Sequence, residues 1–106
     1  MTAIKKGSGN VFADLGFPDP ETHALKAALI HRIAKLIKQE NLTQAEAAKR
    51  MAISQPDVSK MLKGQFRPFS LDRLMKFLNA LGQDVEIAVK AAPRRRARGK
   101  LSVHAV

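Results

Sequence analysis

The segment from Thr43 to Gly64 constrains the fold more than any other part of this 106-residue chain. Thr43 and Glu46 form the S/T-x-x-E pattern of a capping box, which predicts the start of a helix. Ser54 predicts the N-cap of a second helix, and Gly64 follows the last apolar residue of that helix and predicts its end. The segment therefore predicts two short helices of about two turns each, joined by a tight corner.

The apolar residues of this segment predict how the two helices pack. Two short helices that cross steeply need a small side chain at their contact, and Ala48 supplies it. Val58 lies in the middle of the second helix and is the expected partner of Ala48, with Ile53 and Met61 around it. This spacing is typical of the helix-turn-helix motif.

Two longer amphipathic segments flank the motif. A helix is expected over residues 21–40, with an apolar stripe at helical spacing. A last helix is expected over residues 71–81, with Ser70 as its N-cap and Gly82 as its end. Phe66 and Phe69 in the preceding loop are expected to fill the edge of the core. The stripe of the first helix consists of Leu25, Ala28, Leu29, Ile33, Leu36 and Ile37.

The segment from Asp84 to Lys90 changes its period from helical to two. Its apolar residues Val85, Ile87 and Val89 alternate with Glu86 and Ala88, which predicts a β-strand. A single strand is not stable alone. Pairing with residues 101–106 of the same chain is one solution. Pairing with a second copy, which would give a homodimer, is the solution we favour.

The apolar residues near the N-terminus are too many for a free tail. Asn10 can cap a short turn that Gly16 ends, before the proline-rich link over residues 17–20. This turn is expected to pack on its own domain or to bind a protein partner. The residues concerned are Val11, Phe12, Leu15 and Phe17.

The net charge of +10 is concentrated at the C-terminal end. Residues 90–106 hold six Lys and Arg and no acidic residue, while residues 1–89 hold 13 Lys and Arg against 9 Asp and Glu. A basic tail of this kind favours nucleic acid on charge alone, so the case for the folded part must rest on where its charges lie. The absence of cysteine fits a cytoplasmic protein. No signal peptide and no membrane association are expected.

The sequence offers no chemistry for an enzyme. It has no cysteine, no Gly-rich phosphate loop and only three scattered histidines, and its carboxylates are dispersed. We therefore expect no catalytic residue, no metal and no cofactor.

The second helix of the motif is expected to read DNA. The major groove, about 12 Å wide, admits one α-helix, whose N-terminal residues reach base edges. A glutamine can pair with adenine and a lysine with guanine. The expected base-reading residues are Gln55, Pro56, Ser59 and Lys60. The expected phosphate contacts are Thr43, Gln44, Lys49, Lys63, Arg67 and Arg73.

Several short stretches resemble the Cro and phage-repressor, or XRE-type, helix-turn-helix family. They are Leu42–Glu46 with Ala48, Ile53–Gln55 with Val58 and Ser59, Gly64, and Ser70-Leu71 with Leu74 and Ala80-Leu81-Gly82. Residues 11–19 and 84–89 resemble a subgroup that contains HigA-like antitoxins. Three positions depart from the family: Ala52 stands where glycine is usual and must adopt positive φ, Pro56 replaces a side chain that often bonds a base, and Ala47 is smaller than the usual leucine.

The resemblance implies an all-α fold, a compact four- to five-helix repressor-like domain with a short C-terminal β-strand for dimerisation. The expected parts are an N-terminal arm (1–20), the helix-turn-helix domain (21–82), the dimerisation strand (83–90) and a flexible basic tail (91–106). It implies a sequence-specific repressor of its own operon that binds operator DNA and a RelE/HigB-type toxin as partner. A stand-alone phage-type regulator and a non-specific nucleic-acid binder that uses the Arg-rich tail remain alternatives.

Overall fold

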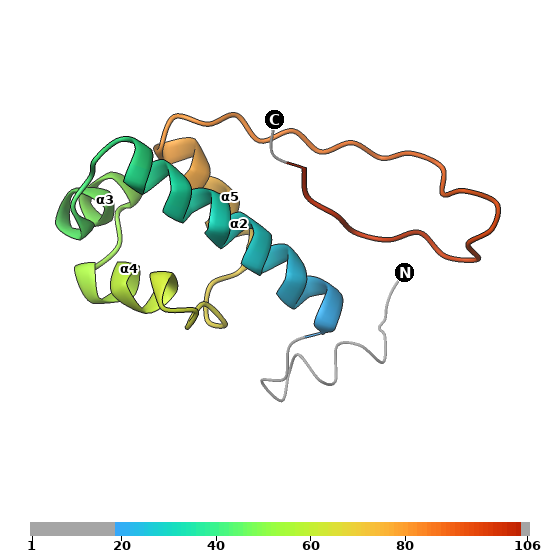
Figure 1. Ribbon diagram of the computed structural model, residues 1–106, viewed down its shortest axis with the longest axis horizontal. Helices are drawn as coiled ribbons and strands as arrows, with labels where there is room; N and C mark the ends of the chain where they lie inside the picture. The colour runs from blue at the N-terminus through green and yellow to red at the C-terminus, as the bar shows by residue number, and fades with distance from the viewer. Residues whose placement is uncertain (1–18, 105–106) are drawn as a thin grey trace.

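The computed structural model describes residues 19–104, which contain four α-helices (Figure 1). They are α2 (Pro20–Gln39), α3 (Gln44–Met51), α4 (Gln55–Leu62) and α5 (Leu71–Ala80). Each lies within one residue of its expected bounds, and the two short central helices are confirmed. The predicted turn of the N-terminal arm, with Val11, Phe12, Leu15 and Phe17, lies outside the described residues.

Every one of these four helices starts at a side-chain cap. The side chains of Asp19, Thr43, Ser54 and Ser70 each accept a hydrogen bond from a backbone N–H in the first turn. These bonds satisfy amides that have no partner within the helix. The caps predicted at Thr43, Ser54 and Ser70 are therefore confirmed.

The four helices also end in the same way, at a residue with positive φ. Asn41, Ala52, Gly64 and Gly82 have φ of 54°, 59°, 91° and 85°. After each of them the next amide bonds back five residues, as Ile53 N does to Ala48 O at 3.1 Å. This is the Schellman motif, which usually requires glycine or asparagine. The positive φ expected of Ala52 is confirmed, and Ala52 is the only residue of the four with an unfavourable side chain for it.

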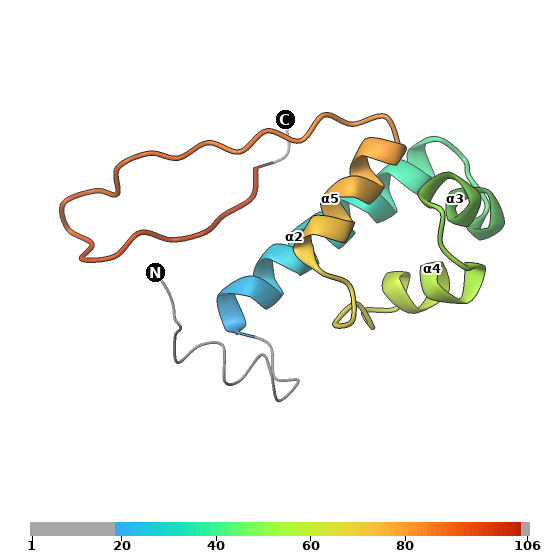
Figure 2. The same ribbon diagram turned by 180° about the vertical axis from the view of Figure 1, so that it is seen from behind.

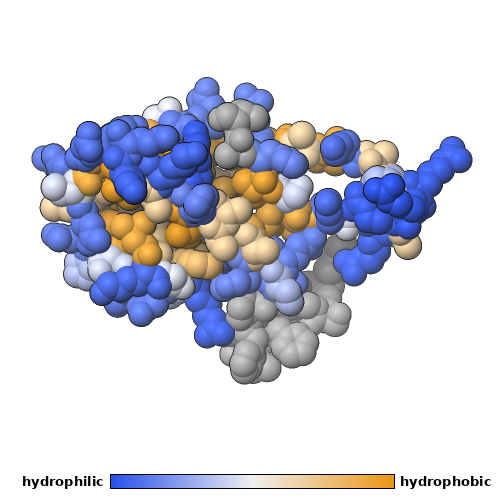
Figure 3. Space-filling view, in the orientation of Figure 1, coloured by the Kyte–Doolittle hydropathy of each residue, from blue (hydrophilic) through white to orange (hydrophobic). Residues whose placement is uncertain are grey.

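The core lies where α2 crosses α5 and the α3–α4 pair (Figures 1 and 2). Phe66 and Phe69 are buried in it, as expected, and the Phe69 ring meets the edge of Phe77 with centroids 5.9 Å apart. Figure 3 shows apolar atoms over the middle of this helical body, surrounded by hydrophilic residues. The most completely buried side chains are Ile33, Val58, Met61, Leu74 and Leu81.

The prediction that Ala28 belongs to the buried apolar stripe of α2 is wrong. Ala28 is exposed, whereas Ile30, which was not assigned to the stripe, is only 7% exposed. The buried face passes through Leu29, Ile30 and Ile33 because α2 contacts both α4 and α5 and so buries a wider arc than a narrow stripe.

The structure does not support the expected C-terminal β-strand. Residues 83–90 form no ladder with any other part of the described chain, including residues 101–104. Val85 packs against the core, but Ile87 is 78% and Val89 94% exposed. The segment leaves the end of α5, extends away from the helices and turns back (Figures 1 and 2), and Leu101 N donates to Glu21 Oε2 at 2.7 Å. An extended segment without a partner has nothing to hold it as a strand.

None of the helices within residues 19–104 is long and apolar enough to cross a membrane.

Candidate nucleic-acid interface

Helix α4 is held by one face and leaves the other free. Its residues Val58 and Met61 are fully buried, and α3 packs closely on it, with Ala47 and Ala48 also buried. The small alanines let the two short helices approach closely, as the sequence predicted. The geometry of α4 relative to the body is therefore set by apolar packing.

The predicted base-reading residues lie on the opposite face of α4. Gln55, Pro56 and Lys60 are exposed, and Ser59 is half-buried. Asp57 is half-buried in the first turn, where its backbone N–H donates to Ser54 Oγ at 3.1 Å. A short helix that projects a polar face beyond the body has the form needed to enter the major groove. The structure brings these four residues together on one face of α4.

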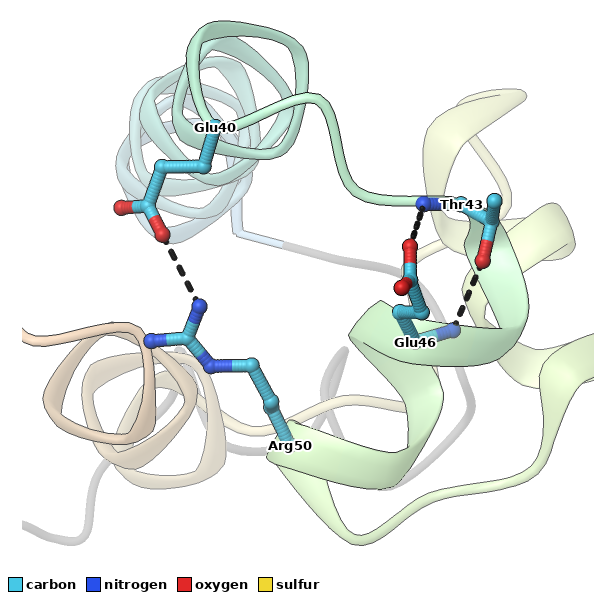
Figure 4. A network of polar contacts seen from close by, with 4 residues as sticks. All are labelled: Glu40, Thr43, Glu46 and Arg50. Carbon is cyan, nitrogen blue, oxygen red and sulfur yellow. Dashed lines mark hydrogen bonds and ion pairs between the residues drawn. The ribbon is translucent and has the colours of Figure 1, made fainter.

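The N-terminus of α3 carries a complete capping box (Figure 4). Thr43 N donates to Glu46 Oε1 at 2.8 Å, and Glu46 N donates to Thr43 Oγ1 at 3.0 Å. None of the hydrogen bonds found in residues 19–104 uses the amides of Gln44 and Ala45. Thr43 is thus occupied by the cap, while the amides at Gln44 and Ala45 remain available to an anion.

The capping box also fixes the charge of Glu46. The hydrogen bond from the Thr43 backbone N–H, aided by the Thr43 side chain, lowers the pKa of the Glu46 carboxyl below its ordinary value of 4.5. Glu46 is therefore ionised at neutral pH and partly offsets the positive end of the α3 dipole.

The predicted phosphate contacts are spread over several elements. Lys49 is exposed on α3, Lys63 is the exposed C-cap of α4, and Arg67 is exposed in the loop that follows. Arg73 lies on α5, where its guanidinium covers the rings of Phe69 and Phe77 at 4.9 and 5.5 Å from their centroids. Arg73 therefore has a packing role that the sequence did not predict.

Two further basic residues of α2 approach the loop after α4, and the sequence analysis did not assign them to the interface. The His23 ring stacks on Phe66 with centroids 5.0 Å apart, and Lys26 Nζ donates to Arg67 O at 3.1 Å. His23 and Lys26 are three residues apart and so share a face of α2. That spacing was visible in the sequence, but the loop they face was not.

A second polar contact joins α2 to α3. Arg50 Nη1 lies 2.8 Å from Glu40 Oε1 (Figure 4), and both side chains are more than a third exposed. Surface pairs of this kind contribute little stability, on the order of 0–1 kcal/mol. Arg50 is thus less available to DNA than Lys49, the other cation of α3.

The remaining predicted sites lie away from this surface or outside the description. Val85, Ile87 and Val89 belong to the extended segment after α5. The residues suggested for a toxin, Val11 to Phe17, are not described. Within residues 19–104, no three His, Asp or Glu side chains gather as they would around a metal ion.

The fold and this surface define a helix-turn-helix protein. The family described as a helix-turn-helix domain matches residues 11–90 of the chain. A solved structure provisionally named an XRE family transcriptional regulator is 43% identical, with a TM-score of 0.79, over 84% of this chain and 100% of that one. The chain belongs to the XRE family of helix-turn-helix proteins, as the resemblance implied. A comparison with curated proteins gave no match.

Proposed function

We propose that this protein is a DNA-binding transcriptional regulator that inserts α4 into the major groove of an operator. The observation that carries the proposal is the two-sided character of α4, with Val58 and Met61 fully buried and Gln55 and Lys60 exposed. Its similarity to an XRE family transcriptional regulator supports the same function.

In this proposal the residues divide into two groups. Gln55 contacts adenine, Lys60 contacts guanine, and Ser59 and Pro56 complete the base-reading face. The amides at the start of α3 and the side chains around α4 bind phosphates, which fixes the register of the helix. The residues proposed to contact phosphates are Thr43, Gln44, Lys49, Lys63, Arg67 and Arg73.

We further propose that the protein acts as a homodimer. One eight-residue helix covers only a few base pairs, so a second copy is needed for a specific operator. The extended segment supports this idea, because Ile87 and Val89 are large apolar side chains left exposed. Pairing of this segment with its copy would cover them and supply the missing strand partner. Two half-sites one helical turn apart, about 34 Å, are expected.

Footprinting on the DNA upstream of the gene tests the proposal. Wild-type protein should protect two half-sites. Gln55→Ala should lose about 1–3 kcal/mol of discrimination at one base pair of each half-site. Gln39→Ala, which removes an exposed glutamine at the end of α2, is the matched control and should bind as wild type does. Binding by the wild type that ignores DNA sequence would contradict the proposal.

A narrower proposal is that this regulator is the antitoxin of a type II toxin–antitoxin pair and represses its own operon. The resemblance of residues 11–19 and 84–89 to HigA-like antitoxins suggests it. The uncovered Ile87 and Val89 also suit a protein partner. Co-expression with the neighbouring gene should yield a complex with a small basic RelE/HigB-type toxin. A complex that survives deletion of residues 1–20 and 91–106 would exclude residues 11–17 and the basic tail as the toxin-binding surface, and would leave Ile87 and Val89 as the candidate. Absence of any complex would favour a stand-alone regulator.

A further inference from the structure

A basic cleft lies beside α4, between the loop that follows it and the first half of α2. Its volume is about 530 Å³, and it is open to solvent. It brings His23 of α2 together with residues 60–68, which are far from it in the sequence. The residues that line it are His23, Lys60, Gly64, Gln65, Arg67 and Pro68.

The walls of the cleft are held by specific contacts. The stack of His23 on the buried Phe66 fixes the ring on the α2 side. The hydrogen bond from Lys26 Nζ to Arg67 O ties the loop to α2 and adds another cation near the cleft. Gly64 carries the positive φ that turns the chain from α4 into this loop. The approach of these basic groups is therefore part of the fold.

Among the described residues 19–104, no acidic side chain lines the cleft to balance its charge. Lys60 and Arg67 both line it, and none of its lining residues is Asp or Glu. Asp19 and Glu21 at the start of α2 do not line the cleft; Asp19 accepts hydrogen bonds from Thr22, and Glu21 accepts one from Leu101 N. Converging cations without a counterion raise the local positive potential and attract an anion.

We propose that this cleft is a phosphate-binding site in which Arg67 and His23 bind one phosphate group, while Lys60 lines the cleft on the α4 side and contacts guanine. A guanidinium can bind phosphate oxygens in pairs, while histidine supplies a single donor. The occupant that fits best is a phosphodiester of the DNA backbone, because the cleft adjoins α4 and is open enough to admit a continuous strand. This assignment of the occupant rests on the proposed function. It would extend the DNA contact from the motif to the first turns of α2.

The first experiment measures how salt affects DNA binding. Full-length wild type is compared with His23→Ala/Arg67→Ala on an unrelated duplex and on the upstream DNA. The control is His31→Ala/Lys35→Ala, which removes exposed residues of the same helix that do not line the cleft. Loss of one phosphate contact should reduce the slope of log K against log salt by about 0.9, so the fall in affinity over a fourfold rise in salt becomes about three- to fourfold smaller. The loss should be equal on both duplexes, because a phosphate contact carries no sequence information.

The second experiment uses inorganic phosphate without DNA. Titration into isotope-labelled wild type should shift the amide resonances of Gly64, Gln65 and Arg67, and these shifts should be absent in His23→Ala/Arg67→Ala. Circular dichroism verifies that the variants are folded. The Phe66 stack is lost with His23, so Arg67→Ala alone serves as a second variant that leaves the stack intact.

The outcomes of these experiments distinguish the proposal of a phosphate site in the cleft from the proposal that the protein is a sequence-specific DNA-binding regulator. A reduced slope together with phosphate shifts supports a DNA phosphate in the cleft. Phosphate shifts with an unchanged slope support the site but replace the DNA backbone with a free phosphorylated ligand. Unchanged slope and no shifts overturn the cleft proposal, even if the wild type protects an operator. Sequence-independent binding by the wild type would overturn the proposed function while both cleft measurements remain valid.

Discussion

The substitution Ala52→Gly should stabilise this protein. Ala52 ends α3 with φ 59° and ψ 42°, in the left-handed region. An L-residue with a Cβ is disfavoured there by roughly 1–2 kcal/mol. Glycine removes this strain but gains freedom in the unfolded chain, which costs about 0.4–1 kcal/mol. Because Ala52 is exposed, little apolar burial is lost, and the net gain should be about 0.5–1 kcal/mol.

An alanine-to-glycine substitution inside a helix should have the opposite effect on the free energy of unfolding. Ala27 is exposed in the interior of α2, where Ala27→Gly should destabilise by about 1 kcal/mol. Urea unfolding followed by circular dichroism at 222 nm measures both variants. With a slope of about 1 kcal/mol/M for a small domain, the two midpoints should move in opposite directions by about 0.5–1 M.

One result would contradict the conclusion that Ala52, at the corner between α3 and α4, is strained. If Ala52→Gly lowers the midpoint as much as Ala27→Gly does, the conformation at Ala52 carries no strain. The corner also sets the direction of α4, since Ala52 is followed by the Schellman bond from Ile53 to Ala48. The stabilised variant should therefore bind DNA with unchanged sequence preference.

Three further predictions concern packing, pH and the tail. Val58→Ala should lower the free energy of unfolding, measured in urea, by about 1–3 kcal/mol because the Val58 side chain of α4 is fully buried. The control Val103→Ala should change the free energy of unfolding little, because Val103 is 37% exposed. The pKa of the Glu46 carboxyl is lowered in the folded state, so ionised Glu46 stabilises the protein at pH values above its unfolded-state pKa near 4.5. The stability advantage of wild type over Glu46→Gln should therefore vanish as the pH falls through the folded-state pKa. An advantage that persists in acid would contradict the capping role of the Glu46 carboxylate. Truncation after Lys90 removes the Arg-rich segment. It should weaken binding to unrelated duplexes and lower the salt dependence of that binding, while protection of the operator persists. Loss of all DNA binding would instead indicate a protein that binds nucleic acid non-specifically through its Arg-rich tail.

The helix boundaries could be read from the sequence because the interactions that set them are local. Each cap joins residues three apart, as Ser70 Oγ and Arg73 N show. Each Schellman ending joins residues five apart. Such contacts form within a short segment whatever the rest of the chain does, so Thr43, Ser54, Gly64 and Gly82 were sufficient to place the ends of the helices.

The C-terminal strand failed as a prediction because its evidence was incomplete. Alternation at Val85, Ile87 and Val89 indicates which side chains would share a face, but not whether a partner strand is present. Within residues 19–104 no partner strand pairs with them, so the segment is extended without a ladder. Whether a second copy supplies the partner is a property of the assembly.

The sequence by itself determined the two short helices, their corner and the polar face of α4, since periodicity and caps act over a few residues. It also determined the unusual conformation at Ala52, because no glycine stands at the corner. Only the tertiary structure decided the wider buried arc of α2, the packing of Arg73 on Phe69 and Phe77, and the meeting of His23, Lys60 and Arg67. Those side chains are brought together by the packing of α2 against the rest of the core, which no local pattern specifies.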